Sequence, residues 1–289
     1  MTVLETKDLT LTYGEGTPFE RTALKNCSIQ IEQGEYLAVI GHTGSGKSTL
    51  VQLLNGLLKP TKGKVLLKGK DIWAKPKEIR KVRFEVGMVF QYPEYQLFDE
   101  TVRKDIAYGP INQGLNDDAI DAVVLEAAQL VGIDEMLDKS PFDLSGGEKR
   151  RAAIAGVIAM APKVLILDEP TAGLDPQGRD RILDLIDRYR KDTGATIILV
   201  SHSMEDVAER AERVLVLDHG EVRMLDSVKN VFARSEELSE MGLKVPQITQ
   251  VFMELKKLGF DYTGSILTVE DGVREVRRLM GKGGVFLDV

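Results

Sequence analysis

The run of residues 41–48, with the sequence GHTGSGKS, constrains the fold more than any other part of the chain. It fits the pattern G-x-x-x-x-G-K-[ST]. The apolar residues 36–40 before it and the helix-like residues 47–58 after it supply the strand and the helix that this pattern requires. The glycines let successive backbone N–H groups turn inward around a phosphate, and the N-terminus of the following helix attracts the same anion. The run therefore predicts a phosphate-binding loop between a buried strand and a helix.

Each residue of this loop has an expected part in binding a nucleoside triphosphate. Lys47 is expected to reach the β- and γ-phosphates, the Ser48 hydroxyl to ligate Mg²⁺, and Thr49 to contact the α-phosphate. The alternative, a glycine-rich turn with an exposed lysine, is disfavoured by the strand and the helix on either side. The other loop residues are also assigned to nucleotide binding: Gly41, His42, Thr43, Gly44, Ser45 and Gly46.

A second, acidic element follows the apolar residues 164–167, where Asp168 and Glu169 end a predicted strand. Ligand sites of α/β proteins form at the carboxyl ends of parallel strands, so this pair is expected beside the phosphate loop. Asp168 is assigned to Mg²⁺, mostly through water, and Glu169 to polarising the attacking water as a general base. Adjacent strand residues point to opposite faces, which would let the two acids take different parts. A solvated strand end is the alternative.

The composition disfavours several classes of protein. The chain has 289 residues and a formal net charge of −7, which argues against nonspecific nucleic-acid binding and against docking on anionic lipid. Its one cysteine, Cys27, excludes a disulfide framework and a cysteine-based zinc site. No apolar run is long enough for a membrane helix, and the first residues do not resemble a signal peptide. A cytoplasmic protein is expected, and any membrane contact would need another chain.

The order of apolar runs predicts an α/β protein. Short buried strands alternate with helices over residues 1–226, which indicates one main domain with a largely parallel sheet and a mostly helical part at about residues 97–160. Residues 227–289 are expected to form a small helical extension, in which Pro246 opens one helix and Thr268 with Asp271 caps another. The expected strands are residues 3–13, 27–40, 86–90, 164–167 and 196–200, with a loop at 14–21, hairpins at 63–72 and 214–224, and helices at 47–58, 117–131 and 178–191.

A third motif lies at residues 144–151, with the sequence LSGGEKRR. Together with the phosphate loop and the acidic pair, it resembles the nucleotide-binding subunits of ATP-binding cassette (ABC) transporters, whose signature is LSGG[QE]. The resemblance covers about residues 1–226. It implies a P-loop ATPase with a mixed sheet core, an N-terminal antiparallel β portion and a helical subdomain, and with ATP and Mg²⁺ as cofactors. By resemblance, Gln91 matches the Q-loop glutamine, which also touches Mg²⁺, Asp175 matches the D-loop aspartate, and His202 matches the switch histidine that binds the γ-phosphate.

The resemblance further implies that one chain holds only half of each ATP site. An aromatic residue before the phosphate loop would stack on adenine, with Tyr13 as the first choice and Phe19 as the second. The signature segment would cap the γ-phosphate held by a partner chain, so that a dimer buries two ATP molecules and opens after hydrolysis. The capping residues are Ser145, Gly146, Gly147 and Glu148, the last standing where many relatives have glutamine.

The segment after Gln91 narrows the resemblance. Residues 91–98, QYPEYQLF, and residues 99–110, DETVRKDIAYGP, resemble the ATPases of energy-coupling factor (ECF) transporters. The match is closest to the second ATPase of the group whose energising module serves several substrate-binding proteins. This implies a different ATPase as dimer partner, a transmembrane T-component, substrate-specific S-components, and a place at the cytoplasmic face of the cell membrane. The implied function is ATP-driven uptake of vitamins or other micronutrients, metal ions among them.

Two alternative functions stay open at this point. The first is the ATPase of a conventional ABC importer that uses an extracytoplasmic binding protein, which the cassette motifs alone do not distinguish. The second is a soluble cassette ATPase acting on DNA or ribosomes, which the acidic charge disfavours.

Two surfaces are expected to serve the partner subunits. A cluster near Gln91 would form a groove for a helix of the T-component, with packing inside the helical part as the alternative. Its members are Tyr92, Tyr95, Leu97 and Phe98, with Arg80, Lys81 and Arg83 as a candidate basic rim. An apolar face of the extension would mediate dimerisation, with packing on the main domain as the alternative. It consists of Ile248, Val251, Phe252, Leu255 and Leu258, whereas no role follows for residues 285–289.

Overall fold

A computed structural model describes residues 1–262 and 264–283, and its centre is a six-stranded sheet. The strands are β4 (Tyr36–Ile40), β7 (Val86–Val89), β8 (Val164–Asp168), β9 (Thr196–Val200), β10 (Arg213–Asp218) and β11 (Glu221–Ser227). Their order is β11-β10-β4-β9-β8-β7, and all are parallel except β11, which pairs antiparallel with β10. Every residue of β4, β8 and β9 is buried, as expected of parallel strands covered on both faces.

A second, antiparallel sheet comes from the N-terminal part of the chain. Its strands are β1 (Thr2–Tyr13), β2 (Arg21–Cys27), β3 (Gln30–Glu32), β5 (Lys62–Leu67) and β6 (Lys70–Asp71). β1 pairs with β2, β3 and β5, and β5 with β6 forms the hairpin predicted for residues 63–72. One hydrophobic cluster joins Leu4 and Leu24 of this sheet with Leu37 and Ile198 of the central sheet. The antiparallel sheet therefore shares a core with the central sheet.

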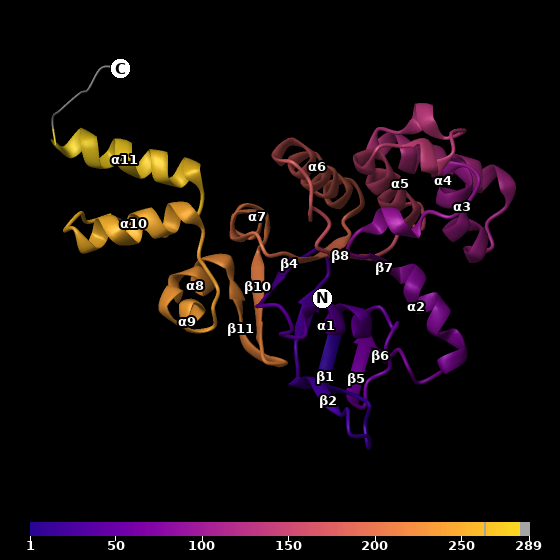
Figure 1. Cartoon of the computed structure of the whole chain (residues 1–289), viewed down its shortest axis with the longest axis horizontal. Helices are drawn as coiled ribbons and strands as arrows, with labels where there is room; N and C mark the ends of the chain where they lie inside the picture. Colours follow the sequence, from indigo (N-terminus) through magenta and orange to yellow (C-terminus); the bar gives the residue numbers. More distant parts are fainter. Residues whose placement is uncertain (263, 284–289) are drawn as a thin grey trace.

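Helices complete the molecule, and Figure 1 shows their distribution around the sheets. Near the phosphate loop and β7 lie α1 (Lys47–Leu54), α2 (Ile79–Glu85) and the 3₁₀ turns Pro76–Glu78 and Pro93–Gln96. The helical part contains α3 (Val102–Gln113), α4 (Asp117–Val131) and α5 (Gly146–Ile158), with 3₁₀ turns at Asp134–Met136 and Pro141–Asp143. The remaining helices are α6 (Pro176–Thr193), α7 (Met204–Arg210), α8 (Val228–Ala233), α9 (Ser235–Glu240), α10 (Gln247–Lys257) and α11 (Val269–Gly283). None of the described helices is long and apolar enough to span a lipid bilayer.

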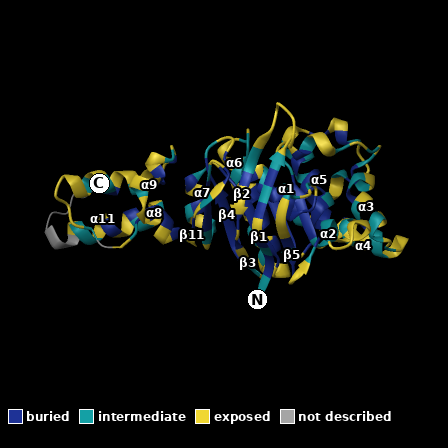
Figure 2. Cartoon of the chain, turned by 90° about the horizontal axis from the view of Figure 1, so that it is seen from below, coloured by how far each residue is buried: buried dark blue, intermediate teal, exposed yellow. Residues whose placement is uncertain are grey.

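The two faces of the central sheet belong to different cores. Along β8, Leu165 and Leu167 pack in the cluster formed with α3, α4, α5 and α6. Val164 and Ile166 pack in the cluster formed with α1 and the antiparallel sheet. This alternation follows from the two-residue period of a strand, which sends successive side chains to opposite faces. Figure 2 shows the buried central strands between exposed outer elements.

The C-terminal helices α10 and α11 project from the side of the molecule that carries α8 and α9 (Figure 1). As predicted, Thr268 and Asp271 cap α11: each backbone N–H donates to the other side chain, at 3.2 Å in both cases. The apolar face predicted on α10 divides in two. Phe252 is buried, and a Cβ atom on Gly272 of α11 would meet its ring at 3.2 Å, whereas Val251 and Leu258 are exposed. Packing against α11 thus accounts for part of that face. The division of the chain at residue 226 stays a prediction, and residues 285–289 lie outside the described part.

Three expectations about local structure are wrong. Residues 27–40 are not one strand, because a turn at residues 33–35 sends β3 to the antiparallel sheet and β4 to the central sheet. The loop before them ends at Glu20, since Arg21 already belongs to β2. The helix after the phosphate loop ends at Leu54 rather than at residue 58. Gly56 adopts a left-handed conformation (φ 70°) and its N–H bonds the Leu53 carbonyl, which closes the helix.

Candidate nucleotide site

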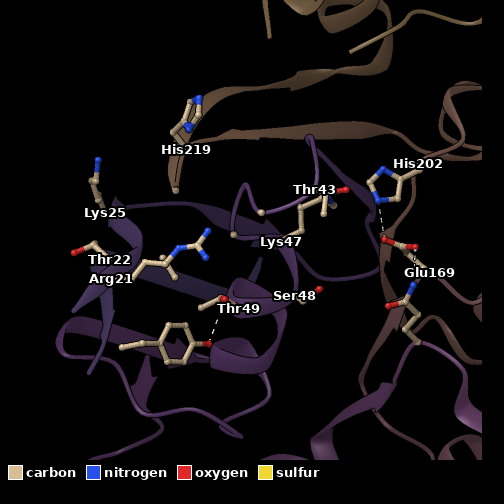
Figure 3. Close-up of a pocket in the computed structure, with 16 residues that line it drawn as sticks. Arg21, Thr22, Lys25, Thr43, Lys47, Ser48, Thr49, Glu169, His202 and His219 are labelled. Carbon is tan, nitrogen blue, oxygen red and sulfur yellow. Dashed lines mark hydrogen bonds and ion pairs between the residues drawn. The ribbon is translucent and has the colours of Figure 1, made fainter. Parts of the chain in front are cut away.

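A cavity of about 680 Å³ opens where the central strands end (Figure 3). Parallel strands place the loops that follow them at one edge of the sheet, which is why residues distant in sequence meet there. Most of the predicted nucleotide residues line it: Tyr13, Thr43, Gly44, Gly46, Lys47, Ser48, Thr49, Gln91, Glu169 and His202. Sequence reasoning missed the other lining residues: Arg21, Thr22, Ala23, Lys25, His219 and Gly220.

Lys47 is held at the floor of the phosphate loop. Its Nζ donates to the carbonyl oxygens of Gly41 at 2.7 Å and His42 at 3.1 Å. Burial lowers the pKa of Lys47, whereas the nearby carboxylates of Glu169 and Asp168 act in the opposite direction. A buried ammonium group on the loop therefore faces two acids and lies ready for an anionic ligand.

Glycine is required at the start of the loop because the end of β10 packs directly on it. A Cβ atom on Gly41 would lie 2.3 Å from the carbonyl oxygen of Leu217, a distance that no side chain tolerates. The Gly220 N–H also donates to the Ser45 carbonyl at 3.0 Å. The loop conformation is therefore fixed by tertiary contacts as well as by its own sequence.

Asp168 ends β8 beside Ser48, as predicted. Burial raises the pKa of Asp168, and a hydrogen bond from the Ser48 side chain opposes this shift. Its Oδ1 atom is buried and has no hydrogen-bond partner among the described residues. An unpartnered carboxylate oxygen next to a hydroxyl is a donor set that suits a hard divalent cation.

Glu169 is the centre of a three-residue junction. Its Oε1 lies 2.8 Å from His202 Nε2, and its Oε2 accepts a hydrogen bond of 3.1 Å from Gln91 Nε2 (Figure 3). Gln91, Glu169 and His202 follow β7, β8 and β9, which are adjacent in the sheet. The interpretation of Glu169 as a strand residue is wrong: β8 ends at Asp168, and Glu169 has φ 52°. The turn away from the strand, rather than strand alternation, separates the two acids.

The structure places the two candidates for the adenine contact differently, and the contact itself stays a prediction. Tyr13 lines the cavity, its ring is partly exposed, and its hydroxyl lies 3.4 Å from Thr49 Oγ1. Phe19, the second choice, is almost fully exposed and is not among the residues that line the cavity. Arg21, Ala23 and Lys25 stand at every second position of β2, and this two-residue period was the signal that they share one face of the strand.

The signature segment lies apart from this cavity. Ser145 caps α5, and Glu148 Oε2 accepts hydrogen bonds from its N–H at 2.7 Å and its hydroxyl at 2.6 Å, which lower the pKa of Glu148. Asp175 caps α6 by accepting from the Gly178 N–H at 2.9 Å. These residues line a separate cavity of about 540 Å³ together with Gly146 and Gly147. Within the described chain, the structure therefore does not bring them to Lys47.

Comparison with known proteins identifies the family. A sequence profile described as "ABC transporter" matches residues 24–172. This chain belongs to the ABC transporter family. Its curated relatives include proteins named "Energy-coupling factor transporter ATP-binding protein EcfA2". The one from Caldanaerobacter subterraneus subsp. tengcongensis is 49% identical over 278 residues, which cover 96% of this chain and 97% of the relative. The one from Clostridium perfringens is 53% identical over 268 residues, covering 92% and 94%. Within the ABC family, the chain belongs to the energy-coupling factor branch.

Solved structures of ABC proteins share the fold. The structure of cbiO1 from Clostridium perfringens, described as part of the ABC transporter complex cbiONQ, matches with a TM-score of 0.74 at 40% identity, over 87% of this chain and 99% of that one. The ATP-binding cassette MJ0796, solved as a dimer bound to ADP and Pi, matches with a TM-score of 0.70 at 28% identity, over 78% and 98%. The predictions of the family, the ABC-type α/β fold and ATP hydrolysis are confirmed. The roles of individual site residues stay predictions.

Arg150 links three functional segments of this ABC ATPase, and sequence reasoning missed it. Arg150 lies in α5, two residues after Glu148 of the signature, and its side chain is buried. Arginine side chains are rarely buried unless they are paired. Its guanidinium donates to Glu94, in the 3₁₀ turn after Gln91, at 2.8 and 3.2 Å. It also donates to the carbonyl oxygens of Pro170 and Ala172, just after Glu169, at 3.2 and 2.7 Å. The segments after Gln91 and Glu169 are thereby tied to the signature helix.

Replacing Glu94 by Ala is expected to lower the free energy of unfolding by about 3 kcal/mol, because the buried Arg150 charge would lose its counter-ion. Asp121→Ala is the matched control. It breaks the Arg103–Asp121 pair, which has exposed side chains, and should cost less than about 1 kcal/mol. Urea unfolding of both variants gives the comparison. Equal losses of stability would show that the Arg150 contacts are not a buried anchor.

Proposed function

We propose that this ABC ATPase is the ATP-hydrolysing subunit of an energy-coupling factor importer for vitamins or other micronutrients. Its place would be the cytoplasmic face of the membrane, where it acts through a transmembrane T-component and S-components. The observation that carries the proposal is the identity of about 50% to EcfA2 proteins over nearly the whole chain. Similarity of that extent includes the segments that would meet other subunits, not only the cassette motifs.

Glu169 is the proposed general base. Hydrogen bonds from Gln91 and His202 orient its carboxylate at the cavity, where it would accept a proton from the water that attacks the γ-phosphate. His202 is proposed to donate to the γ-phosphate in place of its bond to Glu169. Glu169, the proposed base, and His202, the proposed phosphate contact, follow the adjacent strands β8 and β9. Binding of the nucleotide would therefore affect both residues together.

Lys47 and the acidic end of β8 are proposed to hold the triphosphate. Lys47 would exchange its bonds to loop carbonyls for bonds to the β- and γ-phosphates. Asp168, Ser48 and Gln91 would hold Mg²⁺, which the unpartnered Asp168 oxygen supports. When bound, the ion neutralises phosphate charge. Tyr13 is proposed to stack on the adenine.

The signature segment is proposed to complete the ATP site of a second ATPase chain. Ser145, Gly146 and Gly147 begin a helix at a cavity of their own, and a helix N-terminus attracts a phosphate. A facing chain would bring its phosphate loop to that cavity, so that two ATP molecules lie between the chains. ATP would stabilise only the closed arrangement of the two chains. Its hydrolysis would remove that stabilisation, and the pair would open.

The assembled importer tests this proposal. The chain, co-expressed with an energy-coupling factor T-component and a second ATPase, is expected to purify as a complex containing one copy of each ATPase. Native mass spectrometry of the detergent-solubilised complex gives the count. A complex with two copies of this chain and no other ATPase would contradict the heterodimer, and failure to bind any T-component would contradict the importer function.

A groove lined in part by the segment after Gln91 is the proposed contact for the T-component. It has a volume of about 390 Å³, and Phe98 and Tyr108 line it with exposed rings packed edge to face, 5.2 Å apart. Arg80 and Arg83 stand at the same groove, whereas Lys81 is not among its lining residues. Of the predicted cluster, Leu97 packs partly on the helical core, and Tyr92 and Tyr95 are exposed. Exposed aromatic rings in an apolar groove suit an inserted helix.

Phe98→Ala is expected to weaken retention of this chain on membranes that contain the T-component by about tenfold, because a central aromatic anchor is lost. Phe142→Ala is the matched control. Phe142 is similarly exposed on the helical part but does not line the groove. Sedimentation of membranes with each variant measures the bound fraction. The same retention for both variants would place the T-component elsewhere.

The exposed face of the C-terminal helices is proposed to contribute to the pairing of the ATPases. Val251 of α10 and Leu258 directly after it are exposed, and so are Val273, Val276 and Met280 of α11. Two adjacent helices with unpartnered apolar residues form a surface that a second chain could cover.

A further inference from the structure

Two histidines and one aspartate meet at the edge of the nucleotide cavity, and no role described above uses them as a group. His42 belongs to the phosphate loop, and Asp218 and His219 lie at the end of β10 and in the turn after it. Each offers one ligand atom, and the three atoms lie within 4.8 Å of one another. We propose that these residues bind one divalent transition-metal ion of the zinc class. The proposed site is separate from the Asp168–Ser48 pair, and it does not depend on the proposed function.

The spacing of the ligand atoms fits a tetrahedral ion. His42 Nε2 lies 3.0 Å from Asp218 Oδ1, and His219 Nε2 lies 3.7 Å from the same oxygen. Two ligands bound at about 2.0 Å from a tetrahedral Zn²⁺ are about 3.3 Å apart. The two distances to Oδ1 lie on either side of this value. The two imidazole nitrogens lie within 4.8 Å of each other and would move closer together by rotation of the side chains. A water molecule would fill the fourth position.

The second nitrogen of His42 is already oriented as in metal sites. His42 Nδ1 lies 2.8 Å from the Thr43 carbonyl oxygen, which can only accept a hydrogen bond, so Nδ1 carries a proton. Metal-binding histidines usually donate their other N–H to a carbonyl or carboxylate in this way. Nε2 is then the nitrogen that faces Asp218. On binding, the ion would displace any proton held between Nε2 and Oδ1, and that proton would pass to solvent.

The backbone holds the two ligand segments together without an ion. β4 and β10 are neighbouring parallel strands, so the loops after them meet although His42 and Asp218 are 176 residues apart. The packing of Gly41 on Leu217 near the end of β10 and the hydrogen bond from Gly220 to Ser45 fix the loops further. His219 is largely exposed and lines the rim of the cavity, which gives an ion access from solvent (Figure 3). Pre-formed geometry of this kind lowers the ordering cost of binding.

The donor set selects the class of metal. Imidazole nitrogen suits Zn²⁺, Ni²⁺, Cu²⁺ and related ions, whereas Mg²⁺ and Ca²⁺ take oxygen ligands. Two imidazoles and one carboxylate around an open position are a common zinc arrangement. The alternative is a hydrogen-bonded ion pair between His42 and Asp218 with His219 beside it. That pair would bind no metal beyond the level of a single surface histidine.

Zinc titration of the untagged chain without nucleotide tests the site. Calorimetry is expected to show one Zn²⁺ per chain, and Co²⁺ is expected to give the intense visible bands of tetrahedral coordination. His219→Gln and Asp218→Asn should each weaken binding more than about tenfold, since each removes a ligand. Zn²⁺ should also raise the Tm of the wild type and not of the His219 variant, because the ion links two distant segments.

The third histidine of the chain supplies the matched control. His202 faces Glu169 and could itself contribute to a weak metal site. His202→Gln should leave the zinc affinity unchanged. Loss of zinc binding in His202→Gln but not in His219→Gln would move the ion to the catalytic junction and overturn the proposal. Absence of saturable zinc binding by the wild type, or octahedral Co²⁺ spectra alone, would overturn it as well.

Discussion

Glu169→Gln is expected to lower the ATP turnover rate by about 10²–10⁴-fold while ATP still binds, because an amide cannot accept the proton from the attacking water. The hydrogen bonds of the carboxylate give a second reason to expect this loss of turnover. Glu169 accepts from both Gln91 and His202, and an amide offers only one oxygen to these two donors. The variant would therefore lose the base and one orienting contact, and a long-lived, ATP-bound pair of chains is expected.

Phosphate release by the purified complex and equilibrium ATP binding give the two quantities for Glu169→Gln. Glu126→Gln is the control, because it makes the same chemical change at an exposed position of α4 that does not line the nucleotide cavity. Near-normal turnover in Glu169→Gln would remove Glu169 as the base, and His202 would then be the residue to test.

Lys47→Ala is expected to weaken ATP binding by about 10- to 100-fold and to reduce turnover to the level of the background. A hydrogen bond to a charged group contributes about 1.5–3 kcal/mol, and Lys47 is the buried cation within the phosphate loop. The substitution also removes the ties to the Gly41 and His42 carbonyls, so the loop would lose internal support.

Fluorescent-nucleotide titration measures the affinity of Lys47→Ala, and urea unfolding separates loss of binding from loss of folding. Lys163→Ala removes an exposed lysine before β8 and serves as the control. An unchanged affinity and turnover in folded Lys47→Ala would contradict the assignment of this residue to the β- and γ-phosphates.

The sequence predicted the motifs and most strands well because their signals are local. The phosphate loop, the apolar strands before Gly41 and Asp168, and the cap of α11 each depend on residues close along the chain. The errors arose where a turn overrides a continuous pattern. A turn at residues 33–35 divides the segment 27–40, expected to be one strand, between two sheets, and Gly56 ends α1 before the apolar pattern does.

By itself, the sequence determined that this chain has a phosphate loop, a following acidic strand end and the signature of an ABC ATPase. These are short motifs whose spacing sets their local geometry. Only the tertiary structure decided which side chains meet. Gln91, Glu169 and His202 come together because β7, β8 and β9 are neighbours, and His42 meets Asp218 because β4 lies beside β10. The order of strands in a sheet is set by packing among distant segments, so it cannot be predicted from any one short stretch of sequence.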